Sequence, residues 1–127
     1  VGPSKRPFHT IIPGFVSEDG CPRMAFGVMG GHMQHQGHVQ MVKRVFEFGQ
    51  NPQAAIDAPR WHVYPDFTIG LESGFDQSFA SKLVDLGHSV RFEKNESVFG
   101  GAQLILRSEN GFVAGSDSRK EGLAAGY

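Results

Sequence analysis

A pair of adjacent glycines, Gly30-Gly31, stands where an apolar run gives way to a helical pattern. Residues 24–28 before it are typical of a strand end, and apolar residues recur at three- and four-residue steps over 33–48. A helix that starts after such a turn presents backbone N–H groups that have no intrahelical partner. These groups, with the positive end of the helix dipole, suit an anion or a developing oxyanion. A purely structural strand-to-helix turn would have the same sequence pattern, so the anion-binding and the structural interpretation both remain open.

Three histidines follow the glycine pair at three-residue spacing, at His32, His35 and His38. On a helix, residues three apart are neighbours, so these side chains could share one broad face. A metal site would draw on such a cluster, but no Cys or acidic residue stands beside it and glutamines interleave. A polar helix face is therefore the favoured interpretation, and we predict neither a metal nor a cofactor. His32 directly follows the glycines, which makes it a candidate substrate-binding residue.

Hydrophobic period and turn residues predict the elements that position the glycine turn. A strand is expected over 8–12 that continues through Phe15-Val16 after a bend or break at Pro13-Gly14, because proline cannot occupy a central ladder position. An Asp-Gly turn then leads into a return strand over 23–28, which delivers the chain to the glycines. The helix that follows is expected to end near Phe48, at a glycine stop.

The rest of the chain alternates short helices and strands. Asn51 and Pro52 are typical of a helix cap and a first helical position, and Pro59 ends that helix within two turns. An apolar run over 102–106 predicts a strand buried on both faces. The remaining expected elements are strands over 61–64, 67–72, 88–92 and 112–115 and a helix over 76–86. Their order favours an α+β fold, with a mostly antiparallel sheet and flanking helices, over a βαβ ladder.

Length and composition limit the classes of protein to which the chain can belong. The 127 residues are one domain's worth of chain, so we expect a single core over 1–127. A net charge of -1, from 12 basic and 13 acidic residues, gives no bulk field that favours nucleic acid or an anionic membrane. No apolar run approaches the ~20 residues of a membrane span. The single Cys21 excludes an internal disulfide and leaves the compartment open.

An aromatic and charged group of residues invites a functional interpretation but is predicted to be structural. Trp61 lies between a short helix and a strand and is expected in the core. Arg60 is expected to pair with a carboxylate such as Asp57 or Asp117. Asp117 and Arg119 are ion-pair candidates in a polar tail. A Ser-His-Asp triad is not favoured, since no nucleophile-elbow pattern is present.

Several stretches form a recognisable pattern in their order and spacing. They are Gly2 to Pro7, Gly30-Gly31, Asn51 to His62, Gly101-Ala102-Gln103, Gly115 to Arg119 and Ala125-Gly126-Tyr127. Together they resemble the small subunit of gamma-glutamyltranspeptidases, and the resemblance covers essentially the whole chain. The block Asn51 to His62, with its Asn-Pro start and its Pro-Arg-Trp-His end, is the specific part of the pattern.

The resemblance implies an N-terminal-nucleophile hydrolase with a four-layer αββα sandwich. Such enzymes are made as one precursor that cleaves itself and leaves a threonine at the start of the small subunit. That threonine attacks a γ-glutamyl amide with its own α-amine as base, and the acyl group then passes to water or an amine. Gly30 and Gly31 match the family's glycine pair, so the resemblance assigns them to the oxyanion hole.

Two departures from the family pattern bear on function. The nucleophile would lie upstream of Val1, and the internal Thr10 and Thr68 lack the free amine that the mechanism requires. We therefore expect the C-terminal part of a small subunit, inactive by itself and partnered by the missing N-terminal part. Where typical transpeptidases have a Ser-Ser-Met run that holds the substrate α-carboxylate, this chain has His9-Thr10-Ile11. His9 and Thr10 are thus candidate substrate-binding residues, in a pattern closer to the transpeptidase-like acylases.

Three functional interpretations follow. The first is γ-glutamyl transfer or hydrolysis, as in glutathione metabolism, and the second is cleavage of another acyl amide, as by cephalosporin or glutaryl acylases. The third is a non-catalytic folded fragment that acts only in subunit association. A truncated start would leave apolar faces open and so predicts self-association, around Ile11, Ile12, Leu104 and Leu106. The sequence leaves the acyl group, the acceptor and the compartment open.

Overall fold

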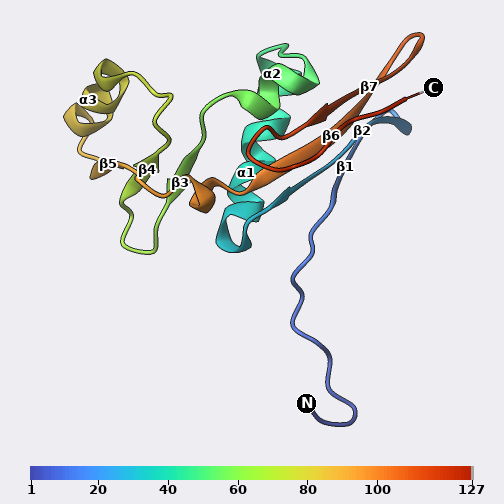
Figure 1. Ribbon diagram of the computed structural model, residues 1–127, viewed down its shortest axis with the longest axis horizontal. Coiled ribbons are helices and arrows are strands. Elements are labelled where there is room, and N and C mark those ends of the chain that lie inside the picture. Colours follow the sequence, from blue (N-terminus) through green and yellow to red (C-terminus); the bar gives the residue numbers. More distant parts are fainter. Residues whose placement is uncertain (127) are drawn as a thin grey trace.

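The computed structural model describes residues 1–126, so Tyr127 of the C-terminal motif lies outside the described residues. Its larger sheet has the strand order β1-β2-β6-β7, and each neighbouring pair is antiparallel (Figure 1). Asp19 and Gly20, the two central residues of the first predicted turn, have positive φ, as a tight hairpin turn requires. Gly111, the last residue of the second predicted turn, also has positive φ. The α+β prediction is thereby confirmed. The strands are β1 (Gly14–Glu18), β2 (Cys21–Met29), β6 (Gly101–Ser108) and β7 (Gly111–Ser116).

Helices cover one face of this sheet. The 3₁₀ turn η1 (Gly31–Met33) leads into α1 (Gln34–Val42), which ends in a π-helical turn, η2 (Lys43–Glu47). The next helix, α2 (Pro52–Asp57), begins as predicted, with the Asn51 side chain accepting the Ala54 N–H at 2.9 Å. The core between helices and sheet contains Met24, Val28, Met41, Val45, Ala55, Ile56, Ala102 and Leu104.

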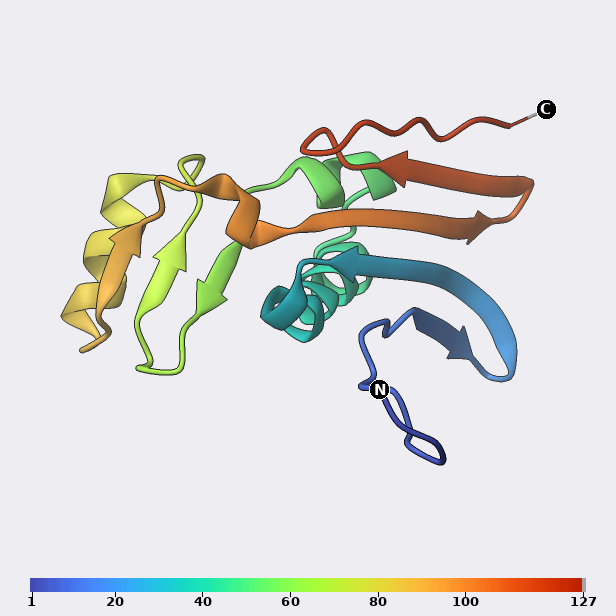
Figure 2. The same ribbon diagram turned by 60° about the horizontal axis from the view of Figure 1, so that its bottom comes forward.

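A second, smaller sheet lies beside the first (Figure 2). Its strands pair in the order β3-β4-β5, antiparallel between β3 and β4 and parallel between β4 and β5. The amphipathic helix α3 packs against β5, and a 3₁₀ turn, η3, returns the chain to the larger sheet. The elements are β3 (Trp61–Val63), β4 (Ile69–Leu71), α3 (Gln77–Asp85), β5 (Val90–Phe92) and η3 (Glu96–Phe99).

Two glutamines of α1 join the two sheets. The Gln36 amide donates to the Val63 carbonyl at 3.0 Å and accepts the Val63 N–H at 2.7 Å. The Gln40 amide does the same with Trp61, at 2.9 Å and 3.2 Å. Since they are spaced about one helical turn apart, the two amides take the place of a neighbouring strand and satisfy the outer edge of β3. The polar face predicted for this helix is therefore a structural connection.

A buried ion-pair network ties the C-terminal tail to the rest of the molecule. Arg60 Nη2 lies 2.5 Å from Asp117 Oδ2, and both side chains are fully buried. Arg119 bridges Asp117, at 3.2 Å, and Glu72, at 2.6 Å. The structural interpretation of these arginines is confirmed. Asp117, and not Asp57, is the partner of Arg60.

The predicted strand over 8–12 is wrong. These residues run as an irregular arm, because the sheet begins at Gly14 and, in the described part of the chain, β1 has a neighbouring strand on one side only. An extended segment without a partner strand cannot form a ladder. Trp61, expected in the core, is half-buried in β3.

The prediction that 102–106 is buried on both faces is also wrong. Leu104 is 2% exposed on the helix-covered face, whereas Ile105 on the opposite face is 49% exposed. Leu104 and Leu106 therefore do not belong to the open apolar surface. That surface includes Phe15, Met29, Ile105 and Phe112. Within residues 1–126, no helix has the length and hydropathy of a membrane span.

Candidate functional site

The predicted glycine turn joins the end of β2 to η1. Gly30 has φ 138° and Gly31 has φ 58°, values that residues with side chains rarely adopt. A Cβ on Gly30 would lie 2.9 Å from Gly100 Cα, and a Cβ on Gly100 would collide with the Met29 carbonyl. The turn and the start of β6 therefore approach each other as only glycine backbone permits.

Hydrogen bonds within the turn set the direction of its first N–H groups. The Met33 N–H donates to the Gly30 carbonyl at 3.1 Å. Because the peptide plane is trans, the Gly31 N–H points opposite to that carbonyl, out of the N-terminal end of the helix. The Gly31 carbonyl accepts the Gln34 N–H, which turns the His32 N–H the same way. With the helix dipole added, this end can stabilise an oxyanion.

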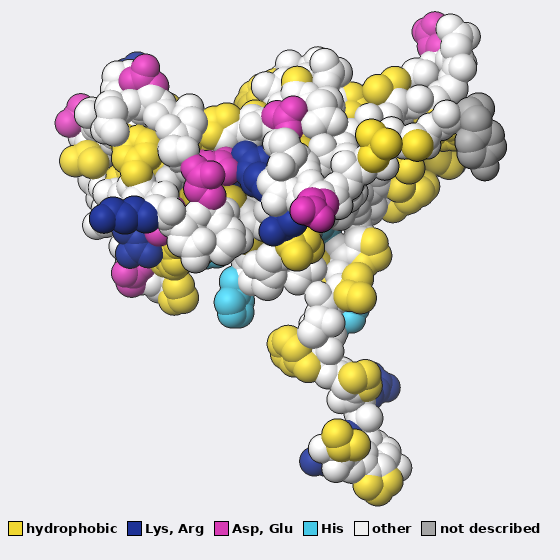
Figure 3. All heavy atoms as spheres, viewed as in Figure 1, with side chains coloured by type: hydrophobic (Ala, Val, Ile, Leu, Met, Phe, Trp, Pro, Cys, Tyr) yellow, Lys and Arg dark blue, Asp and Glu magenta, His cyan; other side chains and the backbone are white. Residues whose placement is uncertain are grey.

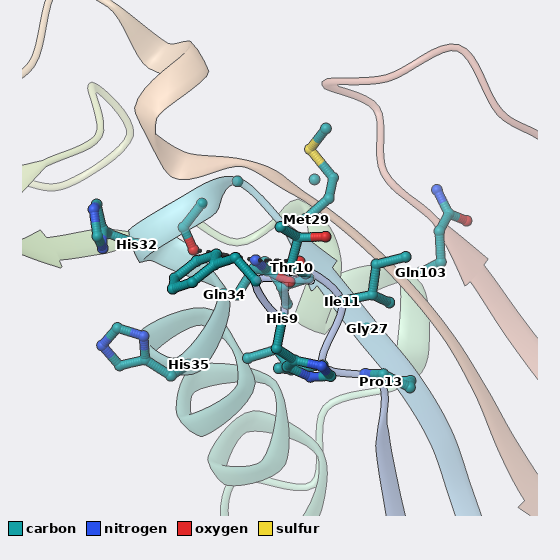
Figure 4. Close-up of a pocket in the computed structure, with 16 residues that line it drawn as sticks. His9, Thr10, Ile11, Pro13, Gly27, Met29, His32, Gln34, His35 and Gln103 are labelled. Carbon is teal, nitrogen blue, oxygen red and sulfur yellow. Dashed lines mark hydrogen bonds between the residues drawn. The ribbon is translucent and has the colours of Figure 1, made fainter. Parts of the chain in front are cut away.

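The glycine turn opens onto a pocket of about 730 Å³ (Figure 4). One wall is the arm over 8–13, and the other is the end of β2, the turn and the start of α1. The structure brings all five predicted site residues to this pocket, namely His9, Thr10, Gly30, Gly31 and His32. Lining residues that the sequence analysis did not single out as site residues include Phe8, Met29, Gln34 and Gln103.

The described lining of this pocket is mostly apolar, and its polar side chains include no Asp, Glu, Lys or Arg. Its polar groups are the imidazoles of His9, His32 and His35, two glutamine amides and the hydroxyl of Thr10. The Thr10 nitrogen belongs to a peptide bond, so this threonine cannot use its own amine as a base. The described lining thus combines outward N–H groups that could bind an anion with a mostly apolar surface.

The three histidines of the first helix have different surroundings. His32 and His35 line the pocket, whereas His38 Nε2 accepts the Val28 N–H at 3.2 Å. Burial, reinforced by His35, lowers the pKa of His38 and favours the neutral ring that an acceptor needs. Burial also lowers the pKa of His62, with His32 and His35 adding to the effect. Among residues 1–126, no three His, Cys, Asp or Glu side chains converge as metal ligands would.

Gln34 connects the two walls of the pocket. Its Nε2 donates to the Thr10 carbonyl at 3.0 Å and to the Gly31 carbonyl at 3.3 Å (Figure 4). The two hydrogens of one amide nitrogen can serve both acceptors. The sequence analysis missed this residue because it assigned the glutamines together to a polar helix face. The available signal was its position one turn after the glycine pair.

The fold has a close counterpart among solved structures. The crystal structure of cephalosporin acylase from Bacillus halodurans matches with a TM-score of 0.90 and 42% sequence identity, over 100% of this chain and 24% of that one. The fold is thus that of the N-terminal-nucleophile hydrolases, in agreement with the class that the resemblance implied.

Sequence comparison then gives the family. The model of the gamma-glutamyltranspeptidase family matches residues 1–127, and the chain belongs to that family of transferases and hydrolases. One relative is the glutathione hydrolase-like YwrD proenzyme of Bacillus subtilis, 35% identical over 98% of this chain. Another is the oxamate amidohydrolase proenzyme of Klebsiella pneumoniae, 33% identical over 100% of this chain. The chain spans 25% of the length of each of these two relatives.

Proposed function

We propose that this chain contributes half of an acyl-transfer site, in an enzyme that cleaves a γ-glutamyl or related acyl amide through a threonyl acyl-enzyme. In this proposal, 1–127 is a single domain, the C-terminal part of a small subunit, and the threonine comes from a segment before Val1. The chain is inactive by itself. The observation that carries the proposal is that the outward N–H groups of the Gly30-Gly31 turn share one pocket with His9 and Thr10.

The proposed chemistry places an oxyanion at the glycine turn. The threonine hydroxyl oxygen attacks the amide carbon while its proton passes to the threonine α-amine, and the substrate carbonyl oxygen becomes an oxyanion. Collapse of this intermediate breaks the C–N bond, and the ammonium returns the proton to the leaving amine. Water or an amine then attacks the ester and restores the hydroxyl. The Gly30-Gly31 turn supplies the oxyanion donors, of which the Gly31 and His32 N–H groups point out of the helix, and such a donor contributes ~10²–10³-fold in kcat.

The acyl group in this proposal lies against the arm over 8–13. Two features of that wall favour the acylase alternative, in which the substrate is not a γ-glutamyl amide. His9 is bulkier than a serine and ionisable, and the lining found among residues 1–126 has no permanently charged side chain to pair with a zwitterionic γ-glutamyl group. The 42% identity to a cephalosporin acylase supports the same alternative.

This chain has an exposed apolar surface to which the remainder of the proposed enzyme could bind. The sheet face opposite the helices is apolar and exposed, and hydrophobic side chains also stand out along the projecting arm in Figure 3. Phe8 of this arm is 91% exposed. Packing of a second sheet on the open face would complete the four-layer sandwich. A non-catalytic fragment that acts only in subunit association would use the same face. The residues that form this face include Phe15, Met29, Ile105 and Phe112.

The test uses the protein as its gene encodes it. Intact mass and N-terminal sequencing determine whether the polypeptide splits ahead of a threonine, and the product is then assayed with γ-glutamyl and glutaryl anilides. We expect cleavage with turnover of at least one anilide, and no turnover by the 127-residue chain alone. Turnover of glutaryl anilide only would identify an acylase, with His9-Thr10 as the reason. Absence of both cleavage and turnover would leave Gly30-Gly31 as a structural turn.

The open sheet face also predicts self-association of the isolated chain. Light scattering should give a mass above that of a monomer, because contiguous exposed apolar surface promotes association. Ile105→Lys, which places a charge in the middle of this face, should shift the distribution toward monomer. A clean monomer of the unsubstituted chain at high concentration would contradict the prediction.

A further inference from the structure

Gln34 lines the pocket but has no role in the proposed mechanism. Its Nε2 lies 3.0 Å from the Thr10 carbonyl oxygen and 3.3 Å from that of Gly31. We propose that Gln34 is a positioning residue that holds the substrate-binding arm at Thr10 against the glycine turn, and that it thereby sets the affinity for the acyl group. This inference rests on the proposed function of the pocket and deepens it.

The arm depends on this contact because little else holds it. Residues 8–13 belong to no strand, and Phe8 and Ile11 are 91% and 72% exposed. Within residues 1–126, the bond from Gln34 is the one hydrogen bond that ties the backbone of 8–13 to another part of the molecule. Ordering a backbone segment costs conformational entropy at every residue. Loss of this bond should therefore release the arm and not merely shift it.

The two bonds of Gln34 are not equally replaceable. The Gly31 carbonyl also accepts the Gln34 backbone N–H, and the Gly30 carbonyl accepts the Met33 N–H at 3.1 Å. The glycine turn thus keeps its geometry without the Gln34 side chain. Thr10, by contrast, has no second donor to its carbonyl among the described residues. The side chain should therefore control the position of the arm, and not the direction of the oxyanion donors.

Gln36 offers a matched comparison on the same helix. It lies two residues further along, and its amide pairs with Val63 and not with the arm. Methionine is close to glutamine in length and helix propensity but has no N–H donor. Substitution by Met at position 34 and at position 36 therefore removes the same chemical group from one helix, and only the first change removes a contact to Thr10.

The experiment compares Gln34→Met, Gln34→Glu and Gln36→Met in the protein as its gene encodes it. Cleavage by chymotrypsin after the exposed Phe8 should become faster in both Gln34 variants, because a released arm fits the protease more easily. Gln36→Met should leave this cleavage unchanged and instead speed hydrogen–deuterium exchange at Val63, whose N–H is bonded to Gln36. In the anilide assay, loss of one hydrogen bond should raise KM about two- to tenfold in the Gln34 variants. Their kcat should stay within about twofold of the original, because the transition-state donors are unaffected.

Two results would overturn the inference. One is unchanged cleavage after Phe8 in both Gln34 variants, which would mean that other contacts hold the arm. The other is a fall in kcat with unchanged KM, which would assign the side chain to the oxyanion turn. Absence of anilide turnover in the unsubstituted protein would instead contradict the proposed function, and the cleavage data would then still decide whether Gln34 holds the arm.

Discussion

Replacement of Asp117 by Asn tests whether the buried ion-pair network holds the C-terminal tail and the sheets together. Asp117 Oδ2 accepts hydrogen bonds from Arg60 Nη2 at 2.5 Å and from the Ala102 N–H at 2.6 Å. The other oxygen, Oδ1, accepts the Arg119 N–H at 2.9 Å and Arg119 Nη1 at 3.2 Å. Each carboxylate oxygen therefore receives two donors in a fully buried position.

The size of the expected loss of stability follows from the charge and the hydrogen bonds that an Asn side chain cannot supply. Asn keeps the shape of Asp117 but removes the charge and turns one oxygen into an NH₂ group that faces donors. Arg60 would retain its bonds to the Phe99 and Ile56 carbonyls, at 3.0 Å each, while its charge would lose its closest carboxylate. Removal of one partner of a buried pair costs about 3–5 kcal/mol. Because the two carbonyl bonds survive, we expect the lower end, about 3 kcal/mol.

Urea unfolding of the 127-residue chain measures this difference. With a slope of about 2 kcal/mol per M, the midpoint should fall by about 1.5 M. Glu47→Gln is the matched control, since it makes the same chemical change in the Lys43–Glu47 pair, which is 2.6 Å long but exposed. That control should cost less than about 0.5 kcal/mol. A cost below about 1 kcal/mol for Asp117→Asn would refute the argument, because the buried charge would then be dispensable.

The same variant has a pH signature. Burial opposes ionisation of Asp117, but hydrogen bonds from Ala102, Arg60 and Arg119 outweigh it and hold the pKa of Asp117 below its ordinary value. A depressed pKa in the folded state contributes stability that is present above the unfolded pKa of about 4 and is lost as pH falls through the folded pKa. The original chain should therefore lose stability below about pH 4 more steeply than Asp117→Asn.

Four further substitutions, two of them a matched pair at the glycine turn, separate the roles of neighbouring groups. Gln40→Leu removes both bonds to the edge of β3 and should cost about 2 kcal/mol in urea unfolding; an unchanged midpoint would contradict this. Gly30→Ala should lower kcat in the anilide assay more than Gly31→Ala, because a Cβ at Gly30 meets backbone at 2.9 Å and one at Gly31 meets nothing within 4 Å; equal losses would count against this steric argument. His38→Asn keeps an acceptor that does not titrate. Since burial depresses the pKa of His38, the free energy of unfolding should fall below about pH 6.5 more in the original chain than in this variant. The same pH dependence of unfolding in both proteins would contradict this prediction.

Most elements of this fold are predictable because their signals are local. Asn51 and Asp76 cap α2 and α3 at the predicted positions, since a side-chain oxygen near an unpaired N–H is a property of a few consecutive residues. The glycine turn is predictable for the same reason, because the change from strand to helix and the need for positive φ are both visible within residues 24–33. Its place in the pocket follows directly from that geometry.

The failed predictions depend on contacts between distant residues. Residues 8–12 have the composition of a strand but no partner strand among residues 1–126. Ile105 is as apolar as its neighbours, yet it faces away from the helices because strand side chains alternate. Gln34 and Gln40 are chemically identical and lie on one helix, but one binds the arm and the other binds β3. Only the tertiary structure decides which backbone each amide meets.

Residues at different positions of the first helix therefore have different roles. The turn at its N-terminal end supplies the proposed oxyanion donors, beginning with Gly31. Gln34, the first residue of α1, holds the proposed substrate wall, and Gln36 and Gln40 hold the second sheet. If these roles are independent, damage at the glycine turn should reduce kcat, damage at Gln34 should raise KM, and damage at Gln40 should reduce stability. Different residues of a single helix would then determine the rate of the chemical step, the substrate affinity and the stability, because each of them contacts a different part of the backbone.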